Sequence, residues 1–178
     1  ASHGQIVFFL DSDDALRPTA VETVLANWRP GVSHYQFPLE VIDEAGQVIG
    51  LHPFSQSAEE GDVHWKLIVA GYYRFMPTSG NAFAREALEK ILPMPAAEWR
   101  LCADTYLVTM STAFGPVVNI AEPLGLYRIH DRNNWYTERA DSAHLRTIWR
   151  QHMQMWRSAV GFIDFASDGK NGAATGRD

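Results

Sequence analysis

The sequence has little of several features that mark particular classes of protein. Its single cysteine, Cys102, cannot form a disulfide within the chain and fits a reducing compartment. No Lys/Arg-rich run is present and the formal net charge is −6, which disfavours nucleic acid and anionic membranes as partners. No apolar run reaches the roughly 18 residues of a transmembrane helix. We therefore expect a cytoplasmic location, at most peripheral to the inner face of a membrane.

The residues that are present indicate a folded α/β protein. Of the 178 residues, 46% are hydrophobic and 12% are aromatic, which is typical of a globular chain with a core of its own. The unbroken apolar run Ile6–Leu10 is typical of a strand that is buried on both faces, as in a parallel sheet. We therefore expect a sheet flanked by helices, with this strand inside it.

Apolar periodicity and turn residues predict the other elements. Pro18 suits the first position of a helix, and Gly71 is a usual helix terminator. Pro38 pushes its strand toward a sheet edge or a bulge. The pattern predicts helices at 18–28, 62–70, 85–92, 104–114 and 141–160, strands at 34–42, 47–51, 117–120 and 124–129, and loops at 52–60 and 72–83. The Gly-rich polar residues from 168 onward predict a disordered tail.

Three aspartates, Asp11, Asp13 and Asp14, follow directly after the first apolar run. Open α/β sheets bind their ligands at the carboxyl ends of strands. Carboxylates packed this closely repel one another, and a cation relieves the repulsion. Oxygen ligands select Mg²⁺ or Mn²⁺ over zinc, so the cluster is a candidate metal site. The alternative is turn chemistry, because aspartate favours turns and helix starts.

Asp104 stands at the start of a predicted helix and is a candidate general base. The alternative is a helix cap, since aspartate is among the best N-cap residues. The positive end of the helix dipole also lowers the pKa of a carboxyl group there, which weakens it as a base.

Two further segments carry polar side chains that could bind a ligand. His130 could ligate a metal, and Arg128 or Arg132 could meet a phosphate, or these residues form an ordinary surface with salt bridges. In the loop at 77–83, Gly80 permits a close backbone approach and Asn81 can bind a hydroxyl group. The alternative for this loop is a plain turn into the next helix.

The order of these motifs resembles the family 2 glycosyltransferases of the GT-A fold. The chain runs from an apolar strand ending in Asp-Ser-Asp-Asp, through Leu-x-Pro into a helix, to a Gly-Asn-x-Phe loop, then x-Asp-Thr at a helix start, and finally Tyr-Arg-x-His-x-x-Asn. The resemblance covers roughly residues 4–134. It implies a GT-A-like mixed sheet flanked by helices and a DXD motif at the first strand.

The resemblance also implies roles for individual residues. Asp13 would bind the divalent cation, Mn²⁺ or Mg²⁺, that bridges the donor diphosphate, with Asp11 supporting it and His130 as a distal metal or diphosphate ligand. Asp104 matches the family's base, although Ala103 stands where the family usually has glutamate. The residues expected to lie beside the donor or acceptor are Asp14, Gly80, Asn81 and Arg128.

The implied activity is inverting transfer of a sugar from a nucleotide-diphosphate sugar to an acceptor hydroxyl, in polysaccharide or glycoconjugate synthesis. Ala103 raises an alternative, a non-catalytic binding or assembly module with the same fold. A metal-dependent phosphohydrolase or nucleotidyltransferase could use the same aspartates and is a third reading.

The first predicted strand begins within the first ten residues, with no βα unit before it. Later strands and a partner chain could cover its edge, which would give a homo-oligomer. We favour the alternative that the N-terminal nucleotide-binding βα units are absent from this sequence, so that the fragment alone would be inactive. The expected parts are a catalytic-domain fragment at 1–135, a helical extension at 136–167 and the tail at 168–178.

Overall fold

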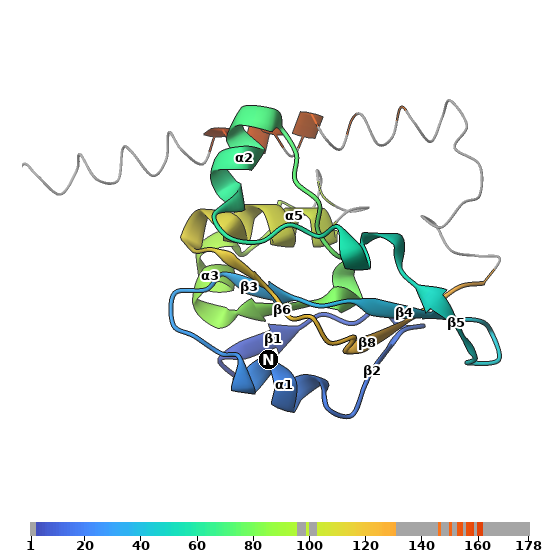
Figure 1. Cartoon of the computed structure of the whole chain (residues 1–178). Coiled ribbons are helices and arrows are strands. Elements are labelled where there is room, and N and C mark those ends of the chain that lie inside the picture. Colours follow the sequence, from blue (N-terminus) through green and yellow to red (C-terminus); the bar gives the residue numbers. More distant parts are fainter. Residues whose placement is uncertain are drawn as a thin grey trace, which may run out of the picture.

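The described part of the chain folds into a mixed α/β structure with two four-stranded sheets and helices packed against them (Figure 1). The computed structural model describes residues 3–95, 99, 103–130, 146, 150, 153–154, 156–158 and 160–161. The strands are β1 Ile6–Phe8, β2 Ala15–Leu16, β3 His34–Gln36, β4 Leu39–Ile42, β5 Val48–Leu51, β6 Asn81–Ala84, β7 Val117–Asn119 and β8 Gly125–Arg128. The helices are α1 Ala20–Ala26, α2 Val63–Ala70, α3 Arg85–Ile91 and α5 Ala103–Ser111, with 3₁₀ turns η1 Pro53–Gln56, η2 Thr78–Gly80 and η3 Thr112–Phe114.

The first sheet has the order β1-β6-β3-β7 and mixes both strand directions. β6 is antiparallel to β1 and β3, whereas β3 and β7 are parallel. The expectation of a parallel neighbour for the first strand is therefore wrong, because β1 is antiparallel to β6, its one partner among the described residues. Among the described residues no strand pairs with its other edge, which agrees with the uncovered edge expected from the sequence.

The unbroken apolar run of β1 has a physical reason even at a sheet edge. Val7 and Phe9 pack against the core under α3 and α5, while Ile6 and Phe8 pack against the core around α1. Figure 1 shows α1 on one side of this sheet and α5 on the other. Because successive residues point to opposite faces, a strand between two cores needs apolar residues at every position. Leu10, beyond the strand, is 46% exposed.

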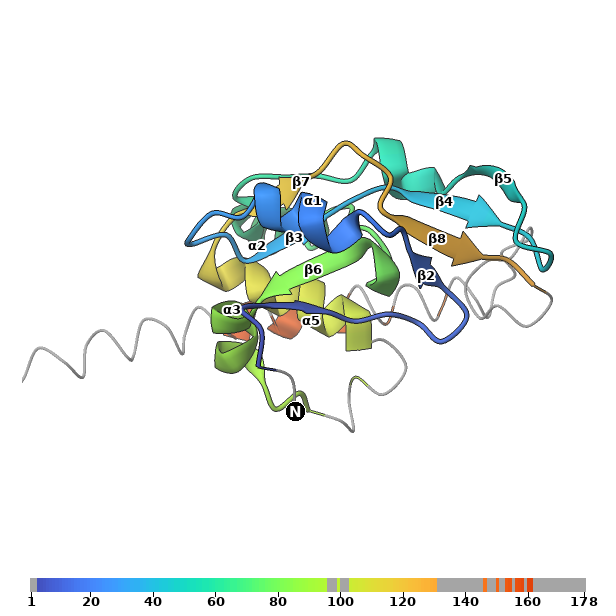
Figure 2. The same cartoon turned by 90° about the horizontal axis from the view of Figure 1, so that it is seen from below.

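The second sheet, with the order β2-β8-β4-β5, continues sideways from the first (Figure 2). The strand predicted at 34–42 is in fact two strands, β3 and β4, which belong to different sheets. Pro38 lies between them and has no backbone N–H to donate to a ladder, so the pairing changes there. The strand predicted at 47–51 is confirmed as β5, which forms a hairpin with β4.

The strand β6 was missed, because its residues were predicted to belong to a loop. Gly80 and Asn81 are turn formers, and the four-residue run that follows is too short to show a period. All four residues of β6 are buried between β1 and β3. Burial in the middle of the sheet therefore decides the structure of this segment against its local turn chemistry.

The helices agree with the sequence in place but are shorter than predicted. The helix predicted at 104–114 is α5 followed by the 3₁₀ turn η3. α2 ends at Gly71, whose φ of +73° is the left-handed conformation expected of a glycine terminator. No helix in the described part of the chain is long and apolar enough to cross a membrane.

Part of the C-terminal segment is described and is helical where it is described, between 146 and 161. Trp156 there donates a hydrogen bond from its indole Nε1 to the Ile68 carbonyl, at 3.0 Å, and its ring lies over Gly71. The predicted tail at 168–178, and the stretch at 131–145 with Arg132, lie outside the described residues.

Candidate active site

The aspartate cluster forms a turn that leaves the carboxyl end of β1. The Asp14 N–H donates to the Asp11 carbonyl at 3.1 Å and closes the turn. Asp14 Oδ1 accepts the backbone N–H of Arg128 at 2.9 Å, which ties the turn to the end of β8. The aspartates therefore do form a turn, which was the alternative to a metal site. A backbone hydrogen bond closes this turn, so its closure does not use the Asp11 and Asp13 carboxylates.

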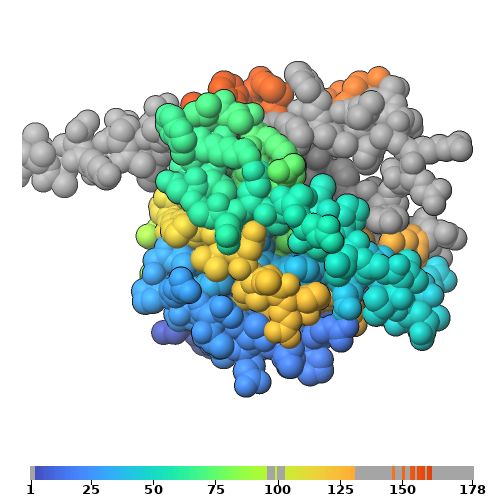
Figure 3. All heavy atoms as spheres, viewed as in Figure 1, coloured from blue at the N-terminus to red at the C-terminus, as the bar shows by residue number. Residues whose placement is uncertain are grey.

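His130, the candidate distal metal or diphosphate ligand, lies directly against this turn. Its Nε2 is 2.9 Å from Asp13 Oδ2, and the two side chains are 24% and 36% exposed. The residues are 117 positions apart in the chain and are brought together by the pairing of β2 with β8. In the space-filling view, the gold-coloured chain of β7 and β8 reaches the surface between the blue N-terminal region and the green helix α2 (Figure 3).

The cluster concentrates negative charge in a partly buried place. Burial raises the pKa of Asp11, and the charge of Asp13 raises it further, while a hydrogen bond from Thr78 opposes the shift. Burial also raises the pKa of Asp14, while hydrogen bonds from the Ser79 side chain and the Arg128 backbone oppose the shift and the charges of Asp13 and Asp11 add smaller rises. Oδ2 of Asp14 is buried and has no hydrogen-bond partner among the described residues. Because these carboxylates are partly buried and repel one another, a bound cation would stabilise their charged forms.

Asp104, in the first turn of α5, lies close enough to Asp11 to feel its charge. Burial raises the pKa of Asp104 and the charge of Asp11 adds to the rise, while the N–H groups of Thr105 and of Asp104 itself lower it. Oδ1 accepts the Thr105 N–H at 2.7 Å, which is not the bond to the second or third helical N–H that an N-cap side chain makes. The expected lowering by the helix terminus is therefore outweighed by burial.

The guanidinium group of Arg128 donates hydrogen bonds to three backbone carbonyls. Nε donates to the Asp13 carbonyl at 3.1 Å, and one terminal nitrogen donates to the carbonyls of Asp43 and Glu44 at 2.9 and 3.3 Å. These bonds fasten the aspartate turn to the β4–β5 hairpin. Arg128 therefore lies in the site, where these hydrogen bonds hold the backbone of the aspartate turn in place. Contact of Arg128 with a phosphate stays a prediction.

Gly80 and Asn81 lie beside the site but act within their own loop. A Cβ at Gly80 would lie 2.8 Å from Met76 Cβ and 3.1 Å from the Phe37 carbonyl, so only glycine fits. The Asn81 amide donates to the carbonyls of Met76 and Pro77 at 2.9 and 2.7 Å. The Asn81 side chain therefore fixes the conformation of its own loop. Binding of a ligand hydroxyl by Asn81 stays a prediction.

One residue of the site was not singled out from the sequence. Ser79 is 1% exposed, and its Oγ accepts the backbone N–H of Asp11 at 3.1 Å. It belongs to η2, which leads directly into β6. Its position just before Gly80 and Asn81 could have marked Ser79 as a candidate site residue. Nothing local in the sequence, however, relates Ser79 to a turn that lies 68 residues earlier.

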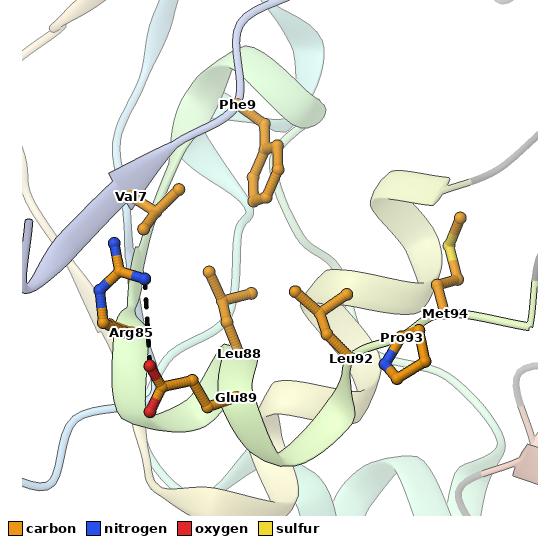
Figure 4. Close-up of a pocket in the computed structure, with 8 residues that line it drawn as sticks. All are labelled: Val7, Phe9, Arg85, Leu88, Glu89, Leu92, Pro93 and Met94. Atoms are coloured by element: carbon orange, nitrogen blue, oxygen red, sulfur yellow. Dashed lines mark ion pairs between the residues drawn. The ribbon is translucent and has the colours of Figure 1, made fainter. Parts of the chain in front are cut away.

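A separate pocket of about 700 Å³ lies beside β1 and α3 (Figure 4). Its lining residues are Val7, Phe9, Arg85, Leu88, Glu89, Leu92, Pro93 and Met94. Figure 4 shows the side chains of Val7 and Phe9 facing those of Leu88 and Leu92. The Arg85–Glu89 ion pair, at 4.0 Å, lies on one side. It contains none of the predicted site residues, so the carboxylate cluster and this apolar pocket are different places.

Comparison with known proteins gives one informative similarity. No family model matches the chain. A protein of Nostoc sp. (strain PCC 7120), named as an uncharacterized glycosyltransferase, is 31% identical over 139 residues. The match covers 75% of this chain and 42% of that protein, so this chain spans less than half the length of the relative it matches.

Proposed function

We propose that this chain carries the metal-binding and proton-accepting residues of an enzyme that transfers a sugar from a nucleotide-diphosphate sugar to an acceptor hydroxyl. The observation that carries the proposal is the meeting of Asp13 with His130, beside an Asp11 whose charge reaches Asp104. These four residues come from three separate parts of the chain. The name of the Nostoc relative supports the same class of reaction.

The side chains present fit a divalent cation such as Mn²⁺ or Mg²⁺. Asp11 and Asp13 offer oxygen ligands, His130 offers an imidazole, and the unpartnered buried oxygen of Asp14 adds to the negative field. Across the described residues, no group of three His, Cys, Asp or Glu side chains could hold a metal by itself. Magnesium sites commonly use one or two carboxylates plus phosphate oxygens, so the donor would complete the coordination. When bound, the cation offsets the charge of the departing diphosphate.

Asp104 is the proposed base. Its carboxylate would accept the proton of the acceptor hydroxyl while that oxygen attacks the anomeric carbon of the sugar. Burial raises the pKa of Asp104 toward the operating pH, which makes it a stronger proton acceptor than an ordinary aspartate. One base and one stabilised leaving group suffice for displacement with inversion, by analogy with inverting hydrolysis, and no protein nucleophile is needed.

The test uses single substitutions in the full-length protein, with a panel of nucleotide-diphosphate sugars. Asp13→Ala is expected to abolish transfer and Mn²⁺-dependent binding of the nucleotide diphosphate. Asp104→Asn is expected to lower transfer by about 10²- to 10⁴-fold while leaving Mn²⁺ binding in place. Asp62→Asn is the matched control, since Asp62 stands before α2 and its side chain makes no cap hydrogen bond.

Each outcome separates the proposal from its rivals. Transfer at wild-type level by Asp13→Ala would sink the proposed role of the aspartate cluster. Linked binding of UDP and Mn²⁺ without turnover would favour a non-catalytic module, the alternative raised by Ala103, which is exposed at the start of α5. Release of free sugar phosphate or of a nucleotide, with no sugar on the acceptor, would favour a phosphohydrolase or nucleotidyltransferase.

A further inference from the structure

Ser79 holds the first residue of the aspartate turn, while Arg128 of β8 holds its last two. On the β8 side, Arg128 makes two hydrogen bonds to the turn, one to the Asp14 carboxylate and one to the Asp13 carbonyl. At the start of the turn, the Asp11 N–H donates to the Ser79 hydroxyl at 3.1 Å. The turn is therefore fixed at both ends, by groups that are far from it in sequence.

Ser79 is well suited to hold a partner in place. It is 1% exposed, and it lies in η2, whose Gly80 N–H donates back to the Pro77 carbonyl at 2.9 Å. Asn81 closes the same loop through its amide group. A hydroxyl on such a rigid support positions whatever it bonds, because neither its backbone nor its side chain is free to follow a displaced partner.

We propose that Ser79 is a positioning residue, whose hydroxyl fixes the turn that carries Asp11 and Asp13 and thereby sets the affinity of the site for a divalent cation. The inference rests on the proposed function, since it concerns the same cation. Ser79 itself touches neither the cation nor the substrates.

The size of the effect follows from the hydrogen bond that is lost. Removing the hydroxyl leaves the Asp11 N–H without its partner and also removes a hydrogen bond to the Asp14 carboxyl. Turn conformations that expose the Asp11 N–H to water therefore gain population. The apparent dissociation constant rises in inverse proportion to the fraction of molecules with the competent turn. A fraction of one in ten gives a tenfold weaker site, which lies within the range expected for one buried hydrogen bond.

The measurement is a Mn²⁺ titration of the full-length protein with UDP present to complete the coordination, followed by the electron paramagnetic resonance signal of free Mn²⁺. A titration without protein corrects for the Mn²⁺ that UDP binds by itself. Ser79→Ala is expected to raise the Mn²⁺ dissociation constant about tenfold, whereas Ser79→Thr, which keeps the hydroxyl, stays within about threefold of wild type. Ser55→Ala is the matched control. The Ser55 hydroxyl likewise accepts a backbone N–H, that of Leu39 at 3.2 Å, but away from the aspartates.

A merely structural role gives a different pattern. Loss of stability alone lowers the melting temperature of Ser79→Ala but leaves the Mn²⁺ affinity of the folded protein unchanged. Affinities are therefore compared at a temperature where circular dichroism shows each variant to be folded. Should Ser79→Ala fail to fold, Thr78→Val replaces it, because the Thr78 side chain hydrogen-bonds the Asp11 carboxylate from the same rigid turn. We then expect about threefold weaker Mn²⁺ binding.

The outcomes distinguish this proposal from the one on which it rests. Wild-type Mn²⁺ affinity in folded Ser79→Ala, or in Thr78→Val if that variant is needed, refutes the positioning role and leaves the proposed function intact. Failure of the wild-type protein to bind Mn²⁺ in the presence of UDP refutes both. Equal weakening in Ser55→Ala also refutes the positioning role, because the effect would then belong to any lost serine hydroxyl.

Discussion

The buried histidine of β3 gives the sharpest prediction about stability. His34 is 0% exposed, and its Nδ1 lies 3.0 Å from the Ser111 hydroxyl and 3.3 Å from that of Ser33. Its Nε2 is buried with no hydrogen-bond partner among the described residues. Burial lowers the pKa of His34 from 6.5 to about 3, because a charged ring has no water to solvate it.

The sign of the pH dependence follows from this lowered pKa. The unfolded chain takes up the His34 proton near pH 6.5, whereas the folded chain takes it up only near pH 3. The stability due to neutral His34 is therefore complete above pH 6.5 and is lost as the pH falls toward 3. Each pH unit in this window corresponds to about 1.4 kcal/mol, so moving from pH 8 to pH 5 costs about 2 kcal/mol.

The assay is urea unfolding followed by tryptophan fluorescence at pH 8 and pH 5. His34→Gln, which cannot take up a proton, is expected to lose about 2 kcal/mol less than wild type between the two pH values. The aspartates of the site titrate alike in both proteins and cancel in this difference. Phe83→Leu is the control, because Phe83 packs on the His34 ring at 5.2 Å and its loss weakens the core without removing a titrating group. Equal pH dependence in wild type and His34→Gln would refute the reasoning.

Three further predictions concern a backbone conformation, a buried hydrogen bond and the binding of Mn²⁺. Gly115→Ala should cost at least about 2 kcal/mol more in urea unfolding than Gly31→Ala, because both have positive φ but a Cβ at Gly115 would lie 2.0 Å from the Gly31 carbonyl oxygen. Tyr73→Phe should cost about 1 kcal/mol by the same assay, because its buried hydroxyl donates to the Val108 carbonyl at 2.7 Å. Mn²⁺ at 100 times its dissociation constant should stabilise wild type by about 2.7 kcal/mol and leave Asp13→Ala unchanged, as read by thermal unfolding.

The sequence predicted which residues meet better than it predicted how the strands pair. Asp11 and Asp13 were singled out because they follow an apolar run, and strand ends carry the ligand sites of open α/β sheets. His130 was singled out because it follows a predicted strand, and its role beside Asp13 was implied by the resemblance to the family 2 glycosyltransferases. The direction of β1 was wrong, because an apolar run shows that both faces are buried but not which strand lies beside it. Pairing partners depend on contacts far along the chain, and no local period encodes them.

The roles of the clamping residues were beyond the sequence for a related reason. Arg128 and Asn81 are the side-chain types that bind phosphates and hydroxyls, and the sequence offers no way to see that their donors go to backbone carbonyls. Ser79 is an ordinary residue in a short turn until the fold brings it to Asp11. Hydrogen bonds between distant segments are a product of tertiary structure, and they decide these cases.

The division of one predicted strand into β3 and β4 bears on how this protein tolerates change in length. Residues 34–42 run parallel to 117–128 through both sheets, paired as β3 with β7 and then as β4 with β8. The first of these segments passes from one sheet to the other through Phe37 and Pro38. The second segment makes the same passage through residues 120–124. A deletion in 120–124 that slips β8 by one residue would turn its side chains to the opposite face and move His130 away from Asp13. Insertions and deletions near the site are therefore constrained by strand register, even in a segment that looks like a loop.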